Sequence, residues 1–419
     1  MVRQSRRQLG DFLEPLVGVL GRSERRVGAA RYVQGLVMAG ERKSIEPMAQ
    51  RLGVAAQGLQ HLLSDSPWED EALWRRVRRE VLPTLGTLEA WIVDETGWLK
   101  QGRQSVGVSH QYCGAVGKQA NCQVCVEVVV SDGEIAAPAA GRLYLPQSWC
   151  AEVKRLRRAG VPREIAFQTK TGIALDLPAK LCGDQVPRAP VLADSLYGDC
   201  GAFRNGLRQL GLEFFLQVTP TGHTAWPEPP RLIKKRNRSH PAADQSKAQT
   251  LLQIASGFPE SHWHPVRWKA ADGSTRHSRL AWQEVYLTHA LRQAGGQPEK
   301  IWLVVDWPQG DEQPYHCYLA HLKSPPQKMA CLRLSRSRWH VEQYFQRGKQ
   351  DLGLDHYEGR SWRGFHHHLV LSAVAYLFVT VMHLRSKKNF WPDLGGSAAA
   401  DPALAGEINR PLPVLPDGI

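Results

Sequence analysis

The feature that most limits the fold of this chain is a change in the sequence pattern at about Ala90. Before Ala90 the apolar residues have the spacing of helices. After it come β-branched and apolar runs broken by Gly, Lys and Asp: "AWIVDETGW", "QSVGVSHQYCGAV" and "NCQVCVEVVVS". Helical and extended segments then alternate through "IALDLPAKLC", "APVLADSLYG", "GAFRNGLRQLG" and "LEFFLQVT". A strand meander followed by alternating helices and strands predicts the α/β fold class, a mixed sheet flanked by helices.

The same patterns divide the 419 residues into five parts. Within the helical N-terminal part, "SIEPMAQRLGVAAQGLQHLLSDSPW" has the cadence of a helix-turn-helix. DNA recognition by the segment from about Ala55 and an ordinary helical hairpin are equally good interpretations of it. We predict a helical domain over residues 1–88, the first part of an α/β core over 89–219, a β-rich insertion over 220–326, the C-terminal helices of the core over 327–388 and a flexible tail over 389–419.

The charge of the chain indicates a polyanionic partner. Lys and Arg number 53 against 40 Asp and Glu, so the formal net charge is +13. Neutralising phosphates with such residues releases bound counterions and drives association. A basic protein that its charge keeps soluble is the alternative. The basic residues cluster, as in "VKRLRR", "RLIKKRNRSH" and "RLSRSR", and this favours nucleic acid as the partner.

Several features argue against a membrane, a secreted protein or a zinc site. The basic N-terminus has no clean apolar core or cleavage site of a signal peptide. The most apolar run, "LVLSAVAYLFVTVMHL", is shorter than the roughly 18 residues of a bilayer span and is interpreted as a buried C-terminal helix. Cys122 and Cys125 are closely spaced, but a second such pair is missing, so we expect buried thiols in a reducing compartment.

The segment "RWHVEQYFQRGKQDLG", from Arg338 to Gly353, has one early acid, Glu342, among basic and aromatic residues. Wound as a helix at about 100° per residue, it forms three stripes. An apolar stripe that faces the core holds Leu334, Val341, Phe345, Gly348 and Leu352; a second stripe holds Arg338, Glu342 and Lys349; the far side holds Arg333, Arg336, His340 and Arg347. Taken alone, this pattern is best explained by a surface helix with an ordinary ion pair one turn apart.

Two further acids, Asp94 and Asp194, change that interpretation. Each follows an apolar run, "AWIV" or "PVLA", where we expect a buried strand to stop. Strand ends in α/β sheets are common ligand sites, although aspartate is also common in turns for its backbone hydrogen bonds. If Asp94, Asp194 and Glu342 converge, their oxygens suit Mg²⁺ or Mn²⁺. Two such ions about 3.5–4 Å apart can promote in-line phosphoryl transfer.

These residues resemble those of a known family. In this order, and with this pattern of elements between them, Asp94, Asp194 and Glu342 resemble the catalytic triad of DDE transposases. The signature Y-x2-R-x3-E-x6-K of bacterial insertion-sequence transposases is matched at Arg338, Glu342 and Lys349. "VDETGWLKQGRQSVGVSHQYCGAVGKQANCQV" and "VLADSLYG" are similar to the insertion-sequence group numbered seven-hundred-and-one, which is related to group four. The sequence departs from the signature at one position, where Ser335 replaces a tyrosine that helps to hold the DNA backbone in the family.

The resemblance implies an RNase H-like catalytic domain and a cut-and-paste reaction. Asp94, Asp194 and Glu342 would hold two Mg²⁺ ions, which Mn²⁺ can replace, and Arg338 and Lys349 would bind DNA phosphates. The enzyme would cut the element's ends and join their 3′-hydroxyls to target DNA. Its partners would be double-stranded DNA and a second copy of the chain, in the bacterial cytoplasm at the nucleoid.

The resemblance also implies a role for the β-rich insertion, and two alternative functions for the whole protein stay open. The β-rich insertion would hold the transposon end, with a base flipped against an aromatic residue during hairpin formation. Its six tryptophans offer candidates, of which most are expected in the core: Trp226, Trp263, Trp268, Trp282, Trp302 and Trp307. Another RNase H-like nuclease or resolvase is one alternative. A non-catalytic DNA-binding protein derived from a transposase is the other, supported by Ser335.

Overall fold

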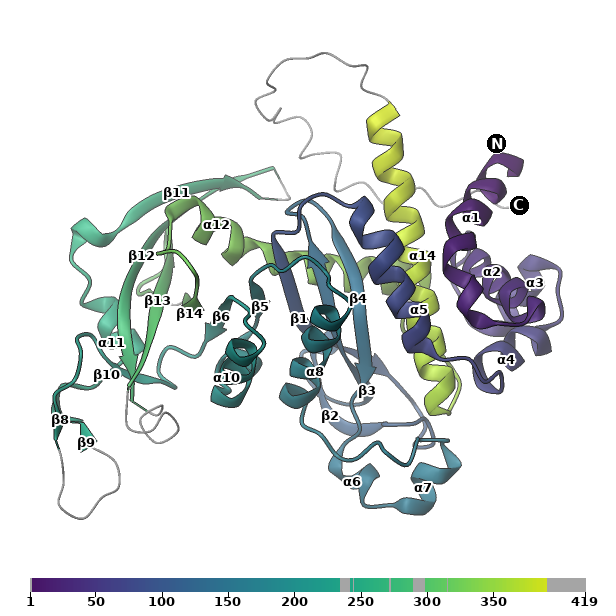
Figure 1. The fold of residues 1–419 in the computed structure, drawn as a ribbon, viewed down its shortest axis with the longest axis horizontal. Helices are drawn as coiled ribbons and strands as arrows, with labels where there is room; N and C mark the ends of the chain where they lie inside the picture. The colour runs from purple at the N-terminus through teal and green to yellow at the C-terminus, as the bar shows by residue number, and fades with distance from the viewer. Residues whose placement is uncertain are drawn as a thin grey trace.

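A single large mixed sheet runs through the computed structural model (Figure 1). The structure describes residues 2–233, 242–243, 245–270, 273–288, 298–314 and 316–389. The strands follow the order β10-β7-β12-β13-β14-β6-β5-β1-β3-β2, with β4 also paired to β3 and β11 to β12. The core strands are β1 (Ala90–Leu99), β2 (Ser109–Cys113), β3 (Lys118–Ser131), β4 (Ala136–Leu143), β5 (Val191–Ala193) and β6 (Phe214–Val218). The α/β class expected from the sequence is therefore confirmed.

The N-terminal part is helical up to the start of β1. Its helices are α1 (Val2–Val17), α2 (Ser23–Val37), α3 (Ile45–Leu52), α4 (Ala56–Ser64) and α5 (Asp70–Arg76). Gly53, with φ of 65°, forms the turn between α3 and α4. A left-handed residue at this position suits glycine, because a side chain there is strained. The α3–α4 pair has the connectivity of a helix-turn-helix, and its role in DNA recognition stays a prediction.

Helices cover both faces of the core sheet. One face carries α8 (Lys170–Gly183), which packs on β3 and β4, and α9 (Ser195–Gly198), which packs on β6. The other carries α13 (Trp339–Leu352), which packs on β1 and β4, and α14 (Trp362–Asn389), which packs on β4. The remaining helices of the core are α6 (Gln147–Cys150), α7 (Val153–Arg158), α10 (Gly201–Gln209) and α12 (Lys328–Ser337).

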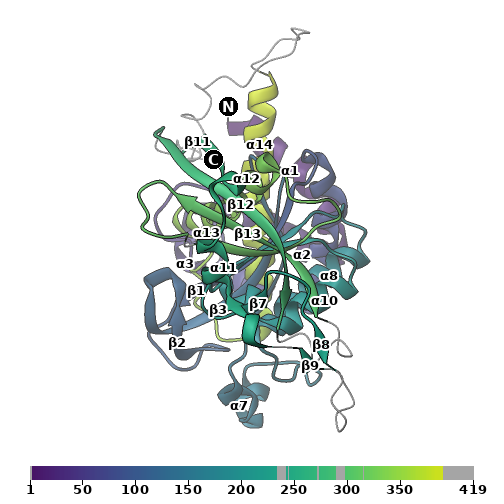
Figure 2. The same cartoon turned by 90° about the vertical axis from the view of Figure 1, so that its left-hand side faces the viewer.

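The insertion extends the core sheet. Its last strand, β14 (His316–His321), pairs antiparallel with β6, so the wide sheet on the left of Figure 1 continues directly from the core. Its other elements are β7 (Thr224–Trp226), β8 (Leu232–Ile233), β9 (Ala242–Ala243), β10 (Gln249–Thr250), α11 (Leu251–Ser256), β11 (His264–Lys269), β12 (Thr275–Leu287) and β13 (Glu299–Pro308). Figure 2 shows these strands from their outer side.

The segment predicted as a helix, from Arg338 to Gly353, forms α13, and α12 ends directly before Arg338. The predicted apolar stripe is buried at Val341, Phe345, Gly348 and Leu352. Two residues assigned to the far side also make internal contacts. His340 hydrogen-bonds the Ser131 hydroxyl (2.7 Å), and Arg336 is ion-paired with buried Asp306 (2.6 Å).

Helix α14 is longer than the apolar run suggested. Residues Trp362–Arg385 are long and apolar enough for a bilayer span by length and composition, but 78% of that segment is buried inside the protein. It packs against α2, α4, α5 and α13, and so joins the N-terminal helices to the core, as expected of a buried helix (Figure 1). The expected tail lies almost wholly outside the described residues, which end at Asn389.

Three consecutive histidines of α14 hydrogen-bond to different parts of the protein. His366 accepts from the backbone N–H of Leu143 in β4 (3.3 Å), and His368 accepts from the hydroxyl of Tyr32 in α2 (2.8 Å). His367 lies between the carbonyls of Leu63 and Trp68. Consecutive helical residues point in different directions, which rules out a shared metal ion and gives these histidines a structural role.

Candidate active site

The register of the sheet places the two aspartates on neighbouring strands. Strand β5 is parallel to β1, with Ile92 beside Leu192, and the same register two residues on puts Asp94 beside Asp194. Asp194 follows β5 directly and caps α9, where its Oδ1 accepts from the Leu196 N–H (3.0 Å). The expectation of a strand end was thus right for Asp194.

Asp94 lies in the middle of a strand, where the sequence suggested an end. β1 continues to Leu99, because β3 pairs with it along its whole length. Its other neighbour, β5, stops at Ala193. Asp94 is therefore at the edge of a gap left by the shorter strand, and its side chain is 14% exposed.

The two aspartates affect each other electrostatically. Burial and then the negative charge of Asp194 raise the pKa of Asp94 to about 7, against the opposing effect of Arg338. Burial also raises the pKa of Asp194, again opposed by Arg338. Two neighbouring buried carboxylates repel each other, so ionising both is unfavourable unless a positive charge lies beside them. A bound cation would supply such a charge.

Arg338 links the third acid to this pair. Its Nη1 is 3.3 Å from Asp94 Oδ2 and its Nη2 is 2.8 Å from Glu342 Oε1. Glu342 is in the first turn of α13 and its side chain is 48% exposed. Arg338, at the junction of α12 and α13, therefore connects Glu342 to Asp94, while the strand register places Asp194 beside Asp94.

The three carboxylates are of the right chemical type to bind a divalent cation, but they do not surround a common point. In the part of the chain that the structure describes, no three acidic, histidine or cysteine side chains are gathered closely enough to hold a metal ion. The available ligands are carboxylate oxygens, which Mg²⁺ and Mn²⁺ prefer. A cation bound by Asp94 and Asp194 would relieve the repulsion that raises the pKa of Asp94.

Lys349 is not placed beside the acids. Its Nζ donates to the carbonyl of Gly97 in β1 (2.9 Å), and burial lowers its pKa. It is two turns beyond Glu342 on α13 and helps to hold that helix on β1. The interpretation of Lys349 as a phosphate ligand stays a prediction, since binding DNA would require it to leave this carbonyl.

Sequence reasoning missed an acid next to the pair. Glu127 in β3 is directly opposite Asp94 in β1, is fully buried and accepts from the Tyr344 hydroxyl of α13 (2.9 Å). Burial raises its pKa to about 8, so it carries a proton at neutral pH. The available signal was one acid within the apolar run "VCVEVVV". Glu127 fixes α13, and with it Glu342, over the sheet.

Glu95 belongs to the face opposite Asp94, because consecutive residues of a strand point to opposite faces. Its carboxylate accepts from Lys170 of α8 (2.5 Å) and from the Tyr197 hydroxyl of α9 (2.9 Å). Gly198 allows α9 to approach this closely, because a Cβ at that position would be 1.9 Å from the carbonyl oxygen of Gln217. Asp194 begins the same short helix, so this packing also determines where its carboxylate lies.

The six tryptophans of the insertion are packed. Trp226 and Trp263 are buried, and Trp268, Trp282, Trp302 and Trp307 are partly buried against the core. This agrees with the expectation that most of them are structural. Among described tryptophans, only Trp339 has a strongly exposed ring, 42% accessible, and it directly follows Arg338.

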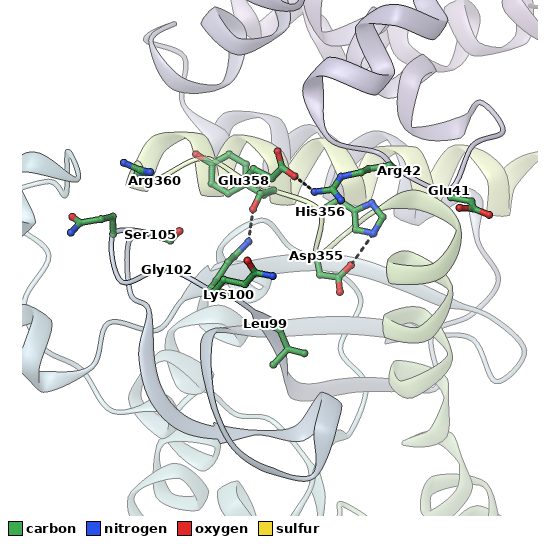
Figure 3. Close-up of a pocket in the computed structure, with 13 residues that line it drawn as sticks. Glu41, Arg42, Leu99, Lys100, Gly102, Ser105, Asp355, His356, Glu358 and Arg360 are labelled. Atoms are coloured by element: carbon green, nitrogen blue, oxygen red, sulfur yellow. Dashed lines mark hydrogen bonds and ion pairs between the residues drawn. The ribbon is translucent and has the colours of Figure 1, made fainter.

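A larger cavity lies away from the acids. It has a volume of about 670 Å³ and is formed by the end of β1, the loop at Arg42 and the segment after α13 (Figure 3). Arg42 pairs with Glu358 in this cavity, and His356, whose pKa is lowered by burial, lies 3.8 Å from Asp355. Lys100 donates to the backbone carbonyl of Tyr357. The cavity lies at a junction between parts of the protein. Its lining mixes positive and negative side chains, so it has no charge of one sign to attract a ligand.

Comparison with known proteins agrees with this geometry. A family model described as a DDE superfamily endonuclease matches residues 15–277, and one described as a transposase DDE domain matches residues 179–378. The chain belongs to the DDE superfamily of endonucleases. The first match contains Asp94 and Asp194, and the second contains Asp194 and Glu342, so the two together cover all three acids. The resemblance inferred from the sequence is confirmed, and the mixed sheet flanked by helices is the RNase H-like arrangement expected of a DDE endonuclease.

A curated relative is also similar to this DDE endonuclease. It is described as a probable transposase for insertion sequence element IS701, from Microchaete diplosiphon, and is 33% identical over 182 residues. The matched segment covers 42% of this chain and 45% of the relative. The chain thus aligns with less than half of that protein's length.

Proposed function

We propose that the protein is the transposase of an insertion sequence, which cuts the element's ends and joins their 3′-hydroxyls to target DNA. The observation that supports the proposal is that Asp94 and Asp194 occupy adjacent positions of neighbouring strands and that Arg338 contacts both Asp94 and Glu342. The likeness to a probable insertion-sequence transposase supports it.

The proposed mechanism uses the acids as metal ligands. Asp94, Asp194 and Glu342 would hold two Mg²⁺ ions, which when bound would activate a water molecule or the DNA 3′-hydroxyl as nucleophile and stabilise the leaving oxygen. Mn²⁺ would substitute. Arg338 can then release the carboxylates and pair with a phosphate, because its fork matches either anion. Glu127 keeps its proton and adds no further negative charge beside the site.

The proposed partners are double-stranded DNA and a second copy of the chain, because two ends must be joined in concert. The insertion extends the sheet beyond Asp194 and would carry the transposon end. Trp339 offers an exposed ring beside Arg338 on which a DNA base can stack. On α4, the exposed Gln57, Gln60 and His61 would face bases of the DNA end. The location would be the cytoplasm.

Strand cleavage by purified protein tests the proposal. The probe is a labelled duplex of the genomic DNA that flanks this gene, incubated with Mg²⁺. Asp94→Asn, Asp194→Asn and Glu342→Gln should each abolish cleavage and keep DNA binding within a few fold. Asp176→Asn is the control, because Asp176 is a half-exposed acid of α8 on the opposite face.

Three outcomes would contradict parts of the proposal. Cleavage that survives one of the three substitutions removes that residue from the metal site. Cleavage of branched DNA without joining of linear ends indicates a resolvase-like nuclease. Binding without cleavage by the unsubstituted protein indicates the non-catalytic alternative that Ser335 suggested.

A further inference from the structure

A small polar pocket opens beside the acids, between α12 and the sheet. Its volume is about 150 Å³. Its polar lining comes from Gln217 in β6, His316 and Tyr318 in β14, and Ser335, Arg336 and Arg338 at the end of α12. Ala193, which directly precedes Asp194, also forms part of the wall. Arg338 therefore borders both this pocket and the acid site.

The register of the sheet aligns the pocket with the aspartates. Ala193 is beside Leu216 in the parallel pair β5–β6, so the next position puts Asp194 beside Gln217. Gln217 is in turn opposite Tyr318 in the antiparallel pair β14–β6. Laterally aligned residues point to the same face of a sheet. The side chains of Asp94, Asp194, Gln217 and Tyr318 consequently form one row on the face that α12 and α13 cover.

Tyr318 is the most informative member of this row. It is 8% exposed, and its ring stacks on Phe215 with 4.5 Å between centroids. Its hydroxyl forms no hydrogen bond with any residue that the structure describes. The hydroxyl is not among the described side-chain atoms that are both buried and without a partner, so it is open to the pocket. A hydroxyl at the wall of a polar pocket is an available donor for a ligand that accepts a hydrogen bond.

The charges of the lining identify the kind of ligand. Arg336 is held by Asp306 and stacked on Trp268 at 3.9 Å, so its position is fixed. Arg338 supplies a second guanidinium, and none of the lining residues is acidic. Ser335 has a short side chain whose hydroxyl donates to the Leu332 carbonyl within α12 (3.0 Å), which leaves the pocket open. The site is built from hydrogen-bond donors and positive charge, and its size suits a phosphate group.

We propose that this pocket binds one backbone phosphate of the DNA strand that is cut, with Tyr318 and Gln217 as donors from the sheet and Arg338 from α12. The inference rests on the proposed function, since it takes the substrate to be DNA. Tyr318 and Gln217 thereby position the strand so that the scissile phosphate meets Asp94 and Asp194. The position at which the sequence departs from the family signature, Ser335, is what gives the phosphate access to them.

The test measures binding without any metal ion. Fluorescence anisotropy in EDTA would follow binding of the flanking-DNA duplex, in which methylphosphonate groups replace single phosphates one position at a time. Tyr318→Phe removes only the hydroxyl and should weaken binding about tenfold, the usual effect of one hydrogen bond to a charged group. Tyr376→Phe removes the same atom from a buried tyrosine of α14 and should leave binding unchanged.

Methylphosphonate scanning distinguishes the pocket from a general loss of affinity. In the unsubstituted protein, a methylphosphonate at one linkage near the cleavage site should weaken binding about tenfold. In Tyr318→Phe the same methylphosphonate should weaken binding little further, because the contact is already lost. At every other linkage a methylphosphonate should weaken the binding of Tyr318→Phe by as much as it weakens that of the unsubstituted protein. Ser335→Leu would fill the pocket from a partly exposed position and should weaken binding at least as much.

Three results would overturn the inference. The first is equal binding by Tyr318→Phe and the unsubstituted protein, and the second is an equal loss of affinity from the neutral linkage in both. The third is unchanged binding by Ser335→Leu. A failure of the proposed function appears differently, as an absence of Mg²⁺-dependent cleavage by the unsubstituted protein.

Discussion

Acid should destabilise this protein through His366 and His368 of α14. Each is buried, neutral and fully hydrogen-bonded. His366 accepts from the Leu143 N–H and donates to the Trp362 carbonyl, while His368 accepts from the Tyr32 hydroxyl and donates to a carbonyl of the segment after α13. Protonation would place an N–H against each of the two groups that now donate. Because α14 joins the N-terminal helices to the core, the effect extends to the whole protein.

The magnitude follows from the pKa values. Burial lowers the pKa of His366 to about 4 and that of His368 to about 3, from an ordinary value of 6.5. The unfolded chain therefore binds more protons than the folded one below pH 6.5, and the free energy of unfolding falls as the pH falls. Each histidine contributes a loss of about 1.4 kcal/mol per pH unit in this range. At pH 4.5 the two together would cost about 5 kcal/mol, as much as the whole stability of many domains.

Urea unfolding followed by circular dichroism between pH 7 and 4.5 measures this loss. His368→Gln keeps a donor and an acceptor but cannot be protonated, so it should lower stability at pH 7 and reduce the slope against pH by about 1.4 kcal/mol per unit. His61→Gln, at an exposed position in α4, is the matched control and should keep the slope. A slope in His368→Gln equal to that of the unsubstituted protein would show that His368 is not buried as a neutral group, and would refute the reasoning.

Three further predictions concern the packing around the site. Gly198→Ala should impair cleavage and stability, because its Cβ would meet a backbone carbonyl at 1.9 Å and displace α9; Gly183→Ala, with nothing within 4 Å, should be neutral in the same assays. Tyr344→Phe should lower the free energy of unfolding by about 1–3 kcal/mol, since buried Glu127 would lose its hydrogen-bond donor, and an unchanged urea midpoint would contradict this. Asp306→Ala should cost about 3–5 kcal/mol by the same measurement, because it breaks a buried ion pair between α12 and the insertion, and a loss below about 1 kcal/mol would show the pair to be dispensable.

The sequence by itself determined the elements and the identities of the acids. The change in sequence pattern at Ala90 located the start of β1. Similar patterns predicted the strands of the core and the insertion, because strand and helix periodicities are local properties of the chain. The order of Asp94, Asp194 and Glu342 and the spacing of the signature indicated the family.

Only the tertiary structure decided which residues meet. Gln217 and Tyr318 align with Asp194 because three strand pairings share a register, and no local pattern encodes such pairing. The same reason explains the contact of Lys349 with β1 and the continuation of the insertion into the core sheet. They arise from contacts between residues far apart in the chain, whose energies depend on burial and distance. Local periodicity records which side of an element is apolar, but not what that side will touch.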